Sequence, residues 1–296
     1  MGQTHLRALR SVDDVAVTVV AEPVEALRQR VGDEFAIAGV ASVGELLAHD
    51  IDGVLIVTPS DTHLRVITEV AASGKAVLCE KPCGVSVEEA REVATVASAA
   101  GIALQIAYWR RFVPELVTLK ARLDAGEFGD VLALHCLQWD GAPPSSEFRA
   151  HSGGIFVDMG VHALDQARWL LGPAFKTLIA LAAPVASDPT VPNDPDAAQV
   201  LGQGAGAVTF VSLGRHYPGG DMVAVEVFGT KDHFYSVFLD PADGERVQLD
   251  ALATQARAFA DFARGGDRRG AGIDDAIAAL EAAERASHLI PWMASA

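Results

Sequence analysis

A lysine and a histidine with neighbouring carboxylates are the residues whose types and spacing could do chemistry in this 296-residue chain. Glu80-Lys81-Pro82 follows a predicted buried strand, and ligands of open α/β sheets bind at such carboxyl strand ends. Asp158, His162 and Asp165 have the spacing that puts side chains on one face of a helix. A histidine oriented by a carboxylate can act as a general base near neutral pH. Each pattern by itself also fits a solvated turn or a polar stripe on a surface helix.

The elements that must position Lys81 alternate between strands and helices through the first hundred residues. Short β-branched or apolar runs predict strands, and amphipathic runs with Ser42, Asp61 or Ser86 as N-cap candidates predict helices between them. This alternation is typical of βαβ units and of a parallel, doubly wound sheet. The predicted strands are 15–20, 35–37, 53–58, 76–79 and 102–107, and the predicted helices are 23–30, 42–48, 61–72 and 86–100.

The pattern changes after residue 107, and we therefore divide the chain into domains 1–107 and 108–296. Beyond the division we expect helices at 114–125 and 156–171 and a long strand at 131–137. Strand then follows strand from 176 to 247, with Pro- and Gly-rich turns such as 189–196, which predicts a mostly antiparallel sheet. Two alanine-rich helices, at 251–264 and 273–288, end the chain.

Composition excludes several classes of protein. The formal charge of −16 argues against a nucleic-acid partner and against binding to an anionic membrane surface. No apolar run has the ~18 residues that a membrane span needs, and the N-terminus lacks the features of a secretory signal. Three cysteines are too few for a disulfide framework, so we expect a cytoplasmic location, and no metal-binding motif is present.

The order of these motifs resembles the Gfo/Idh/MocA family, named for glucose–fructose oxidoreductase and inositol dehydrogenase. The resemblance rests on Glu80-Lys81-Pro82, Tyr108-Trp109-Arg110-Arg111-Phe112 and Asp158-x-x-x-His162-x-x-Asp165-x-x-x-Trp169, and it covers nearly the whole chain. It implies a Rossmann-type sheet followed by an α+β domain with a large open sheet. It also implies NAD-dependent hydride transfer from a secondary alcohol of a cyclitol or sugar. The inositol 2-dehydrogenase branch is the most similar, so an inositol is our first candidate and a hexose-type sugar the second.

The resemblance assigns catalytic roles to three residues. Lys81 would contact the nicotinamide ribose and the substrate hydroxyl, and would stabilise the developing oxyanion. His162 would accept the hydroxyl proton while hydride passes to the nicotinamide. Asp158 would orient both side chains and hold a substrate hydroxyl.

The resemblance also assigns binding roles. Glu22 would bond a ribose hydroxyl, and its carboxylate would repel a 2′-phosphate, which favours NAD over NADP. The remaining cofactor residues would be Gly2, Thr58, Pro59, Ser60, His63, Glu80, Lys81 and Pro82. Arg111, Asp165 and Tyr217 would line the substrate pocket. Apart from the resemblance, Trp139 and Asp140 end a predicted strand and form either a pocket wall or an ordinary sheet edge, and His151 before the glycine pair either reaches the site or lies on the surface.

One departure from the family concerns the phosphate-binding loop. In a dinucleotide-binding fold a strand and Gly-x-Gly-x-x-Gly precede the first helix. Gly2 matches the last of those glycines, and the preceding strand and glycines are absent from the sequence as given. We expect that Met1 is an internal residue of a longer native chain; the alternative is a short chain with an impaired phosphate site. In both cases we expect a gap between the predicted strands 15–20 and 53–58.

Two other functions remain compatible with the sequence. One is a regulatory or catalytically impaired dinucleotide-binding protein. The other is a related enzyme that uses bound NAD for redox-assisted cleavage or epimerisation. Net formation of NADH from a free cyclitol would separate a dehydrogenase from both. The resemblance further implies a homodimer or homotetramer that assembles through the large sheet.

Overall fold

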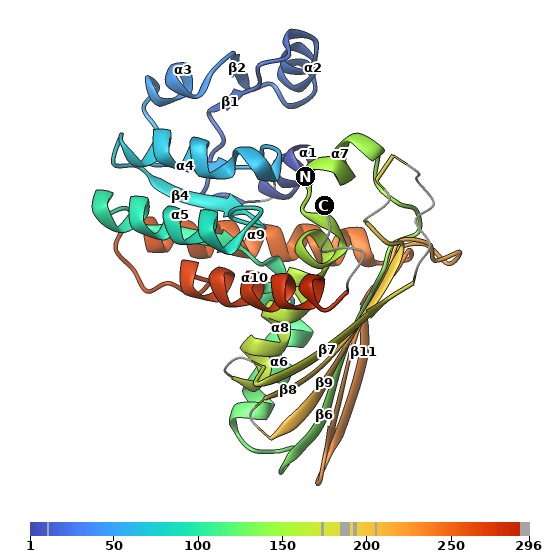
Figure 1. Ribbon diagram of the computed structural model, residues 1–296. Coiled ribbons are helices and arrows are strands. Elements are labelled where there is room, and N and C mark those ends of the chain that lie inside the picture. Colours follow the sequence, from blue (N-terminus) through green and yellow to red (C-terminus); the bar gives the residue numbers. More distant parts are fainter. Residues whose placement is uncertain (11, 173–174, 184–189, 192–193, 205, 291–296) are drawn as a thin grey trace.

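The chain forms a parallel-sheet part and a large open sheet, with helices between them (Figure 1). The computed structural model describes all residues except 11, 173–174, 184–189, 192–193, 205 and 291–296. The predicted turn at 189–196 therefore lies partly outside the described residues. The predicted α/β architecture, a Rossmann-type part followed by a mostly antiparallel sheet, is confirmed.

The parallel sheet that carries Lys81 has the strand order β3-β4-β5. These strands are Gly53–Ile56, Ala76–Glu80 and Leu104–Ala107. All residues of β4 and β5 are buried, as expected for strands that are covered on both faces. The helix α4 (His63–Ala71) packs on β4 and on α5 (Val87–Ala100). Ser86 caps α5 by accepting from the Glu89 amide, as predicted.

The strands β1 (Val19–Ala21) and β2 (Ala38–Val40) form a second parallel sheet, together with α2 (Glu25–Phe35) and α3 (Val43–Leu47). We expected a gap between the first predicted strand and 53–58, and β1 and β3 do belong to different sheets. The first strand is also shorter than predicted. Residues Val15 and Val17 instead pack on a small cluster formed by Leu9, Val12, Ala253 and Ala256.

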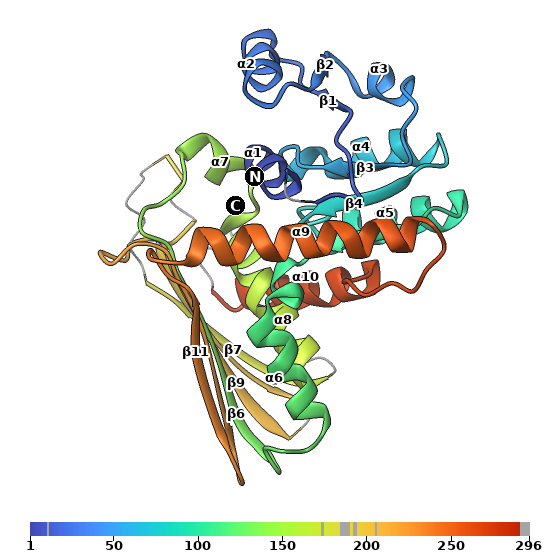
Figure 2. The same cartoon turned by 180° about the vertical axis from the view of Figure 1, so that it is seen from behind.

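The second part contains the sheet β11-β10-β6-β9-β8-β7. Neighbouring strands are antiparallel except β6 and β9, which pair in parallel. Helices α6 (Pro114–Asp124) and α8 (Val161–Leu171) lie on one face of this sheet (Figures 1 and 2). The strands are β6 (Val131–Trp139), β7 (Thr177–Ala182), β8 (Ala197–Gly204), β9 (Ala207–Gly214), β10 (Met222–Gly229) and β11 (His233–Leu239).

The last two helices return to the parallel-sheet part. The helix α9 (Gly244–Ala263) packs on α1 (Gly2–Leu9), and α10 (Ile273–His288) packs on α5 and α8. The predicted strand region to residue 247 was wrong at its end, because α9 begins at Gly244. The carboxylate of Asp240 accepts from the amides of Ala242 and Asp243, and this turn ends the last strand.

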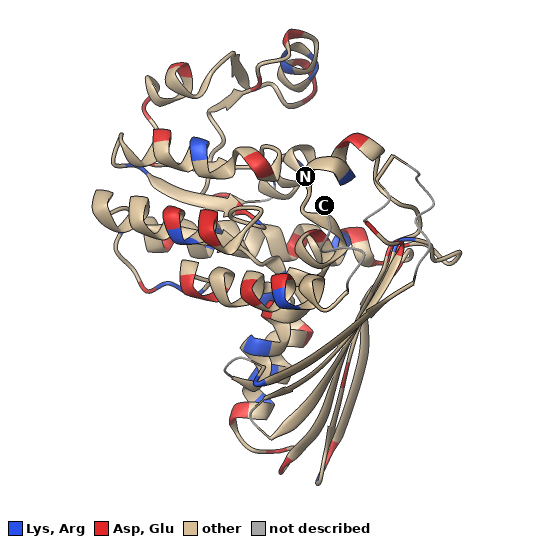
Figure 3. Cartoon of the chain, viewed as in Figure 1, with Lys and Arg blue, Asp and Glu red and all other residues tan. Residues whose placement is uncertain are grey.

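The charges are unevenly distributed over these elements. Figure 3 shows that acidic and basic residues gather on the helices, whereas most of the large sheet carries none. Within the described residues no helix has both the length and the apolar character of a bilayer span. Cys79, Cys83 and Cys136 are all buried and unbridged, and no metal-binding cluster of three or more acidic, His or Cys side chains occurs in the described part.

Candidate active site

The ammonium group of Lys81 joins the two parts of the molecule. Lys81 directly follows β4, and the Lys81–Pro82 peptide bond is cis. Its Nζ donates to the backbone oxygen of Asp158 at 2.7 Å and to Asp158 Oδ1 at 3.3 Å. The side chains of Lys81 and Asp158 are only 15% and 12% exposed, so water screens this ion pair weakly.

Two buried histidines hold the turn around Lys81. His5 Nε2 lies 2.7 Å from Glu80 Oε1, and Glu80 Oε2 accepts from the Lys81 amide. Burial alone would raise the pKa of Glu80, but the hydrogen bond and charge of His5, with the charge of Lys81, bring it below its usual value. The ring nitrogens of His63 lie 2.6 Å from Pro82 O and 2.9 Å from Thr58 O. His63 therefore connects the Lys81 turn to the loop after β3.

Asp158 lies in a π-helical turn, η3 (Phe156–Gly160), directly before α8. Gly153 and Gly154 precede it at φ values of 79° and 81°, a backbone conformation that residues other than glycine rarely adopt. The Ile155 amide donates to Asp194 Oδ1 at 2.8 Å, which fixes the start of the turn. A π-helical turn adds a residue to the helical repeat and is frequent at functional sites.

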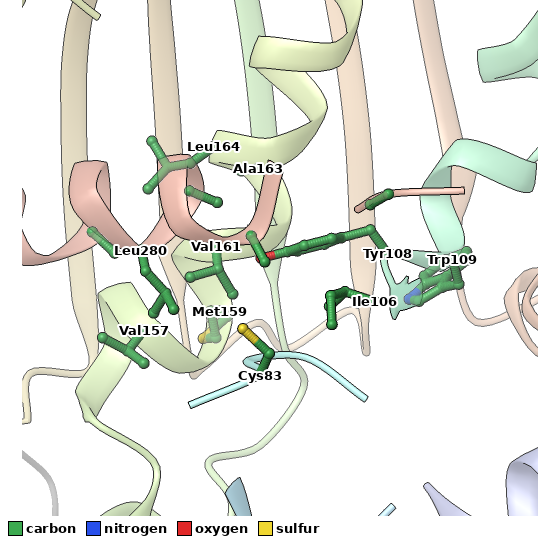
Figure 4. Close-up of a cluster of buried hydrophobic side chains, with 14 of the residues drawn as sticks. Cys83, Ile106, Tyr108, Trp109, Val157, Met159, Val161, Ala163, Leu164 and Leu280 are labelled. Carbon is green, nitrogen blue, oxygen red and sulfur yellow. The ribbon is translucent and has the colours of Figure 1, made fainter. Parts of the chain in front are cut away.

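His162 lies one turn after Asp158, in the first turn of α8, and is 8% exposed. Its ring packs edge-on against Tyr108 with the ring centroids 6.0 Å apart. Figure 4 shows Tyr108 pointing toward the segment that carries Met159 and Val161. Burial lowers the pKa of His162 well below its usual value, and the positive charges of Lys81 and Arg110 lower it further. His162 is therefore neutral near pH 7, as an acceptor of a proton must be.

The other carboxylate oxygen of Asp158 contacts Arg215, which sequence reasoning missed. Arg215 Nη1 lies 3.3 Å from Asp158 Oδ2, and its Nη2 lies 3.2 Å from Asp194 Oδ2. Arg215 directly follows β9, and its side chain is fully buried. The only sequence signal would have been an arginine at the end of a predicted strand, which does not reveal its partners.

Two of the residues predicted for the substrate pocket, Arg111 and Asp165, pair with each other. Arg111 donates to both oxygens of Asp165, at 3.0 and 2.5 Å, and also contacts Asp275 at 3.3 Å. This pair is buried and connects η2 (Trp109–Phe112), α8 and α10. Burial raises the pKa of Asp165 to about 6, although the charge of Arg111 opposes the shift. Tyr217 is 39% exposed and its amide donates to Asp140 O, with no described hydrogen bond to Lys81, Asp158 or His162.

Trp139 and Asp140 lie at the end of β6, and His151 lies on the surface near the loop after β3. Trp139 donates from Nε1 to Ser212 Oγ at 2.9 Å. Burial raises the pKa of Asp140 to about 6, and the negative charges of Asp221 and Asp158 contribute to the rise. His151 ends α7 (Ser146–His151), is 61% exposed, and lies 3.0 Å from Asp61 in the loop after β3.

The predicted cofactor residues lie along the carboxyl edge of the parallel sheets. Gly2 begins α1, Glu22 follows β1, and Thr58, Pro59 and Ser60 follow β3. A Cβ on Gly2 would lie 3.5 Å from Val57, so the helix start is close to this edge. Helix-start amides suit phosphate oxygens and a carboxylate after β1 suits ribose hydroxyls, so the residues present fit a dinucleotide. Oε1 of Glu22 accepts from the Val24 amide at 2.9 Å.

The site thus combines the positively charged hydrogen-bond donor Lys81 with His162, a neutral imidazole that can accept a proton. Lys81 can stabilise negative charge on an oxygen, His162 can take a proton, and Asp158 lies between them in the chain and contacts Lys81. This combination suits the removal of a proton from a hydroxyl group as a hydride leaves the attached carbon.

Comparison with protein-family models gives two matches. Residues 1–108 match the oxidoreductase family model with an NAD-binding Rossmann fold. Residues 116–235 match the GFO/IDH/MocA C-terminal domain.

Comparison with known proteins gives relatives over nearly the whole chain. The rhizopine catabolism protein MocA of Rhizobium meliloti is 44% identical over 98% of this chain and 92% of its own length. The scyllo-inositol 2-dehydrogenase (NAD(+)) of Bacillus subtilis is 32% identical over 79% of this chain and 70% of its own. A crystal structure of a myo-inositol dehydrogenase from Corynebacterium glutamicum superposes with a TM-score of 0.86 at 28% identity, over 98% of this chain and 93% of that one.

Proposed function

Since this chain belongs to the Gfo/Idh/MocA oxidoreductase family, we propose that it oxidises a secondary alcohol of a cyclitol to a ketone with NAD, an inositol being the first candidate. The observation that carries the proposal is the contact of Lys81 with Asp158, one helical turn before His162. It brings an ammonium group from one part of the molecule to the carboxylate and imidazole of the other. A cyclitol is preferred to a hexose because relatives with similar sequences are named inositol dehydrogenases.

The proposal places NAD at the carboxyl edge of the parallel sheets, where it supplies the acceptor of the hydride. The amides of α1 from Gly2, the loop Thr58-Pro59-Ser60 and the carboxylate of Glu22 would hold it. A carboxylate at Glu22 favours NAD over NADP. His63, Glu80 and Pro82 would support this edge through the contacts around Lys81. We divide the chain into a dinucleotide-binding domain, 1–107, and a substrate-binding and assembly domain, 108–296; the extents of the two family matches support this.

In the proposed mechanism His162 is the base. Its Nδ1 is buried and has no partner among the described residues. The lowered pKa of His162 keeps the ring neutral near pH 7, and with the ring proton on Nδ1 the nitrogen Nε2 accepts the hydroxyl proton. Lys81 Nζ donates to the substrate oxygen as negative charge develops there. Asp158 holds Lys81 in place and accepts from a neighbouring substrate hydroxyl. The buried surroundings exclude water and strengthen these interactions.

We also propose that two copies of the chain associate through the uncovered face of the large sheet. The strand register aligns one row of side chains across this face: Ile179, Leu201, Phe210, His135, Glu226 and Tyr235. Ile179, Leu201 and Tyr235 are 55%, 44% and 58% exposed. We call this the apolar row because four of its six side chains are apolar; His135 and Glu226 form an ion pair within it. Exposed apolar side chains that lie side by side are typical of interfaces between proteins. The three unbridged cysteines support a cytoplasmic location.

The test is a measurement of NADH formation with the purified protein. We expect NADH with myo- or scyllo-inositol and NAD, and much less with NADP or with hexoses. Binding of NAD without NADH formation from any cyclitol would support the regulatory alternative and contradict this proposal. Conversion of a cyclitol without net NADH would support redox-assisted chemistry instead.

A further inference from the structure

Arg215 is a fully buried cation that the proposed mechanism does not use. Its guanidinium lies between two carboxylates, with Nη1 3.3 Å from Asp158 and Nη2 3.2 Å from Asp194. A buried arginine is found where its planar fork satisfies specific acceptors, because an unpaired charge away from water is costly. One of those two acceptors is the carboxylate that contacts Lys81.

The two oxygens of Asp158 have different cationic partners. Oδ1 accepts from Lys81 Nζ and Oδ2 faces Arg215 Nη1, each at 3.3 Å. Rotation of the carboxylate would break one or both contacts. Arg215 therefore restricts Asp158 to the orientation in which Oδ1 faces the lysine.

Arg215 is itself held from several sides. Asp194 accepts from Arg149 Nε at 2.8 Å and from the Ile155 amide at 2.8 Å, so this second carboxylate is fixed to α7 and to the start of η3. The Arg215 amide donates to Asp196 O at 2.8 Å. The Trp139 ring lies over Gly214, where a Cβ would come within 2.1 Å of it. The backbone before Arg215 thus has a defined place in the sheet.

We propose that Arg215 is a positioning residue that acts on catalysis through Asp158. It lies at the end of β9, whereas Asp158 lies in the π-helical turn. It therefore connects the sheet to the reacting groups and sets where the Lys81 ammonium is held. This inference rests on the proposed function, because it concerns the same three groups.

The test begins with Arg215→Met, which keeps the side-chain length and removes the charge. A misplacement of catalytic groups by about 1 Å can lower turnover about 100-fold, and we expect a fall in kcat of that order. The dissociation constant for NAD should change by less than about twofold, because the described partners of Arg215 are Asp158, Asp194 and Asp196, none of them a predicted cofactor residue. Arg215→Lys should restore part of kcat, since one ammonium can pair with Asp158 but cannot bridge to Asp194.

A matched control separates positioning from folding. Arg149→Met removes a guanidinium from the same Asp194 without touching Asp158. We expect it to lower the thermal unfolding midpoint at least as much as Arg215→Met, with a clearly smaller fall in kcat, because Arg149 reaches Asp158 only indirectly, through Asp194. Equal losses of kcat in both variants would overturn the proposal.

A double-mutant cycle tests whether Arg215 acts through Asp158. In an Asp158→Asn background, Arg215→Met should lower kcat by less than about threefold rather than about 100-fold. Losses that multiply would show that Arg215 acts independently of Asp158, and would overturn the proposal. Nearly full kcat in the single variant Arg215→Met would also overturn the proposal.

A structural measurement tests the inference without any turnover. In a crystal structure of Arg215→Met, or of Arg215→Gln if the first variant does not fold, the Asp158 carboxylate should rotate away from Lys81 Nζ. An unchanged Lys81–Asp158 contact would overturn the inference and leave the proposed function standing. A wild-type protein without dehydrogenase activity would contradict the proposed function and leave this structural result valid.

Discussion

At the scale of single residues, Lys81 and His162 are both largely buried but differ in the charged groups around them. Lys81 retains a carboxylate partner, whereas His162 lies near the cations Lys81 and Arg110 and has no described carboxylate partner. The sequence placed both residues correctly on their elements but could not show this arrangement. The pKa of His162 is lowered by burial and by the charges of Lys81 and Arg110, two residues that are far from His162 in the sequence.

Replacement of Lys81 by Met tests its role directly. Because the ammonium group stabilises charge that develops only during the reaction, we expect kcat to fall about 1000-fold. The affinity for NAD, measured by titration calorimetry, should change much less. A variant with nearly normal turnover would remove Lys81 from the mechanism.

The pH dependence of kcat/KM tests His162. Burial and the charges of Lys81 and Arg110 lower its pKa, so its neutral form persists as the pH falls through 6.5. We expect the acid limb of the profile below that value, and we expect its loss with a decrease of kcat of about 100-fold or more in His162→Gln. A limb at or above 6.5 that survives this substitution would exclude His162 as the base.

At the scale of elements, local signals predicted most helices and strands. The helix 273–288 was predicted with its observed bounds, and Ser42 and Ser86 cap their helices as expected. Asp61 does not cap α4, because a short 3-10 turn precedes that helix. The π-helical turn at Asp158 was not predicted: it follows two glycines at positive φ, and its start is held by a hydrogen bond from Ile155 to the distant Asp194, which the sequence does not reveal.

Arg111 shows why partners could not be predicted from spacing. The resemblance predicts Arg111 in the substrate pocket, and the structure adds that it pairs with Asp165 and Asp275 between three elements. Removal of one member of a buried ion pair costs about 3 kcal/mol. We therefore expect Arg111→Met to lower the thermal unfolding midpoint by roughly 5–10 °C.

A substrate measurement on the same variant separates the two roles. If Arg111 acts as a connection between elements, the KM for the cyclitol should stay close to that of the wild type. A large rise in KM with an unchanged midpoint would instead place Arg111 in the substrate pocket.

At the scale of the whole molecule, charge and apolar surface are segregated. The chain carries a formal charge of −16, yet most of its large sheet carries no charged residue (Figure 3). The helices α6 and α8 cover the opposite face. This segregation is the basis of the proposed association of two copies.

Ile179→Asp tests that association. Ile179 lies in the apolar row and is 55% exposed, so an aspartate there should disrupt the interface without disturbing the core. We expect a smaller molar mass by light scattering and sedimentation. The matched control is Val117→Asp, which is 47% exposed but lies on α6, one of the helices that cover the opposite face. The same molar mass in wild type and both variants would contradict this interface.

Isotope labelling tests directly whether a hydride passes from an inositol to NAD. The protein would be given NAD and an inositol deuterated at every ring carbon, and the reduced nicotinamide would be analysed by mass spectrometry and proton NMR. We expect one deuterium at nicotinamide C4, transferred more slowly than hydrogen from unlabelled inositol. Reduced cofactor without deuterium, or consumption of the labelled inositol without reduction of the cofactor, would show that the protein is not an inositol dehydrogenase.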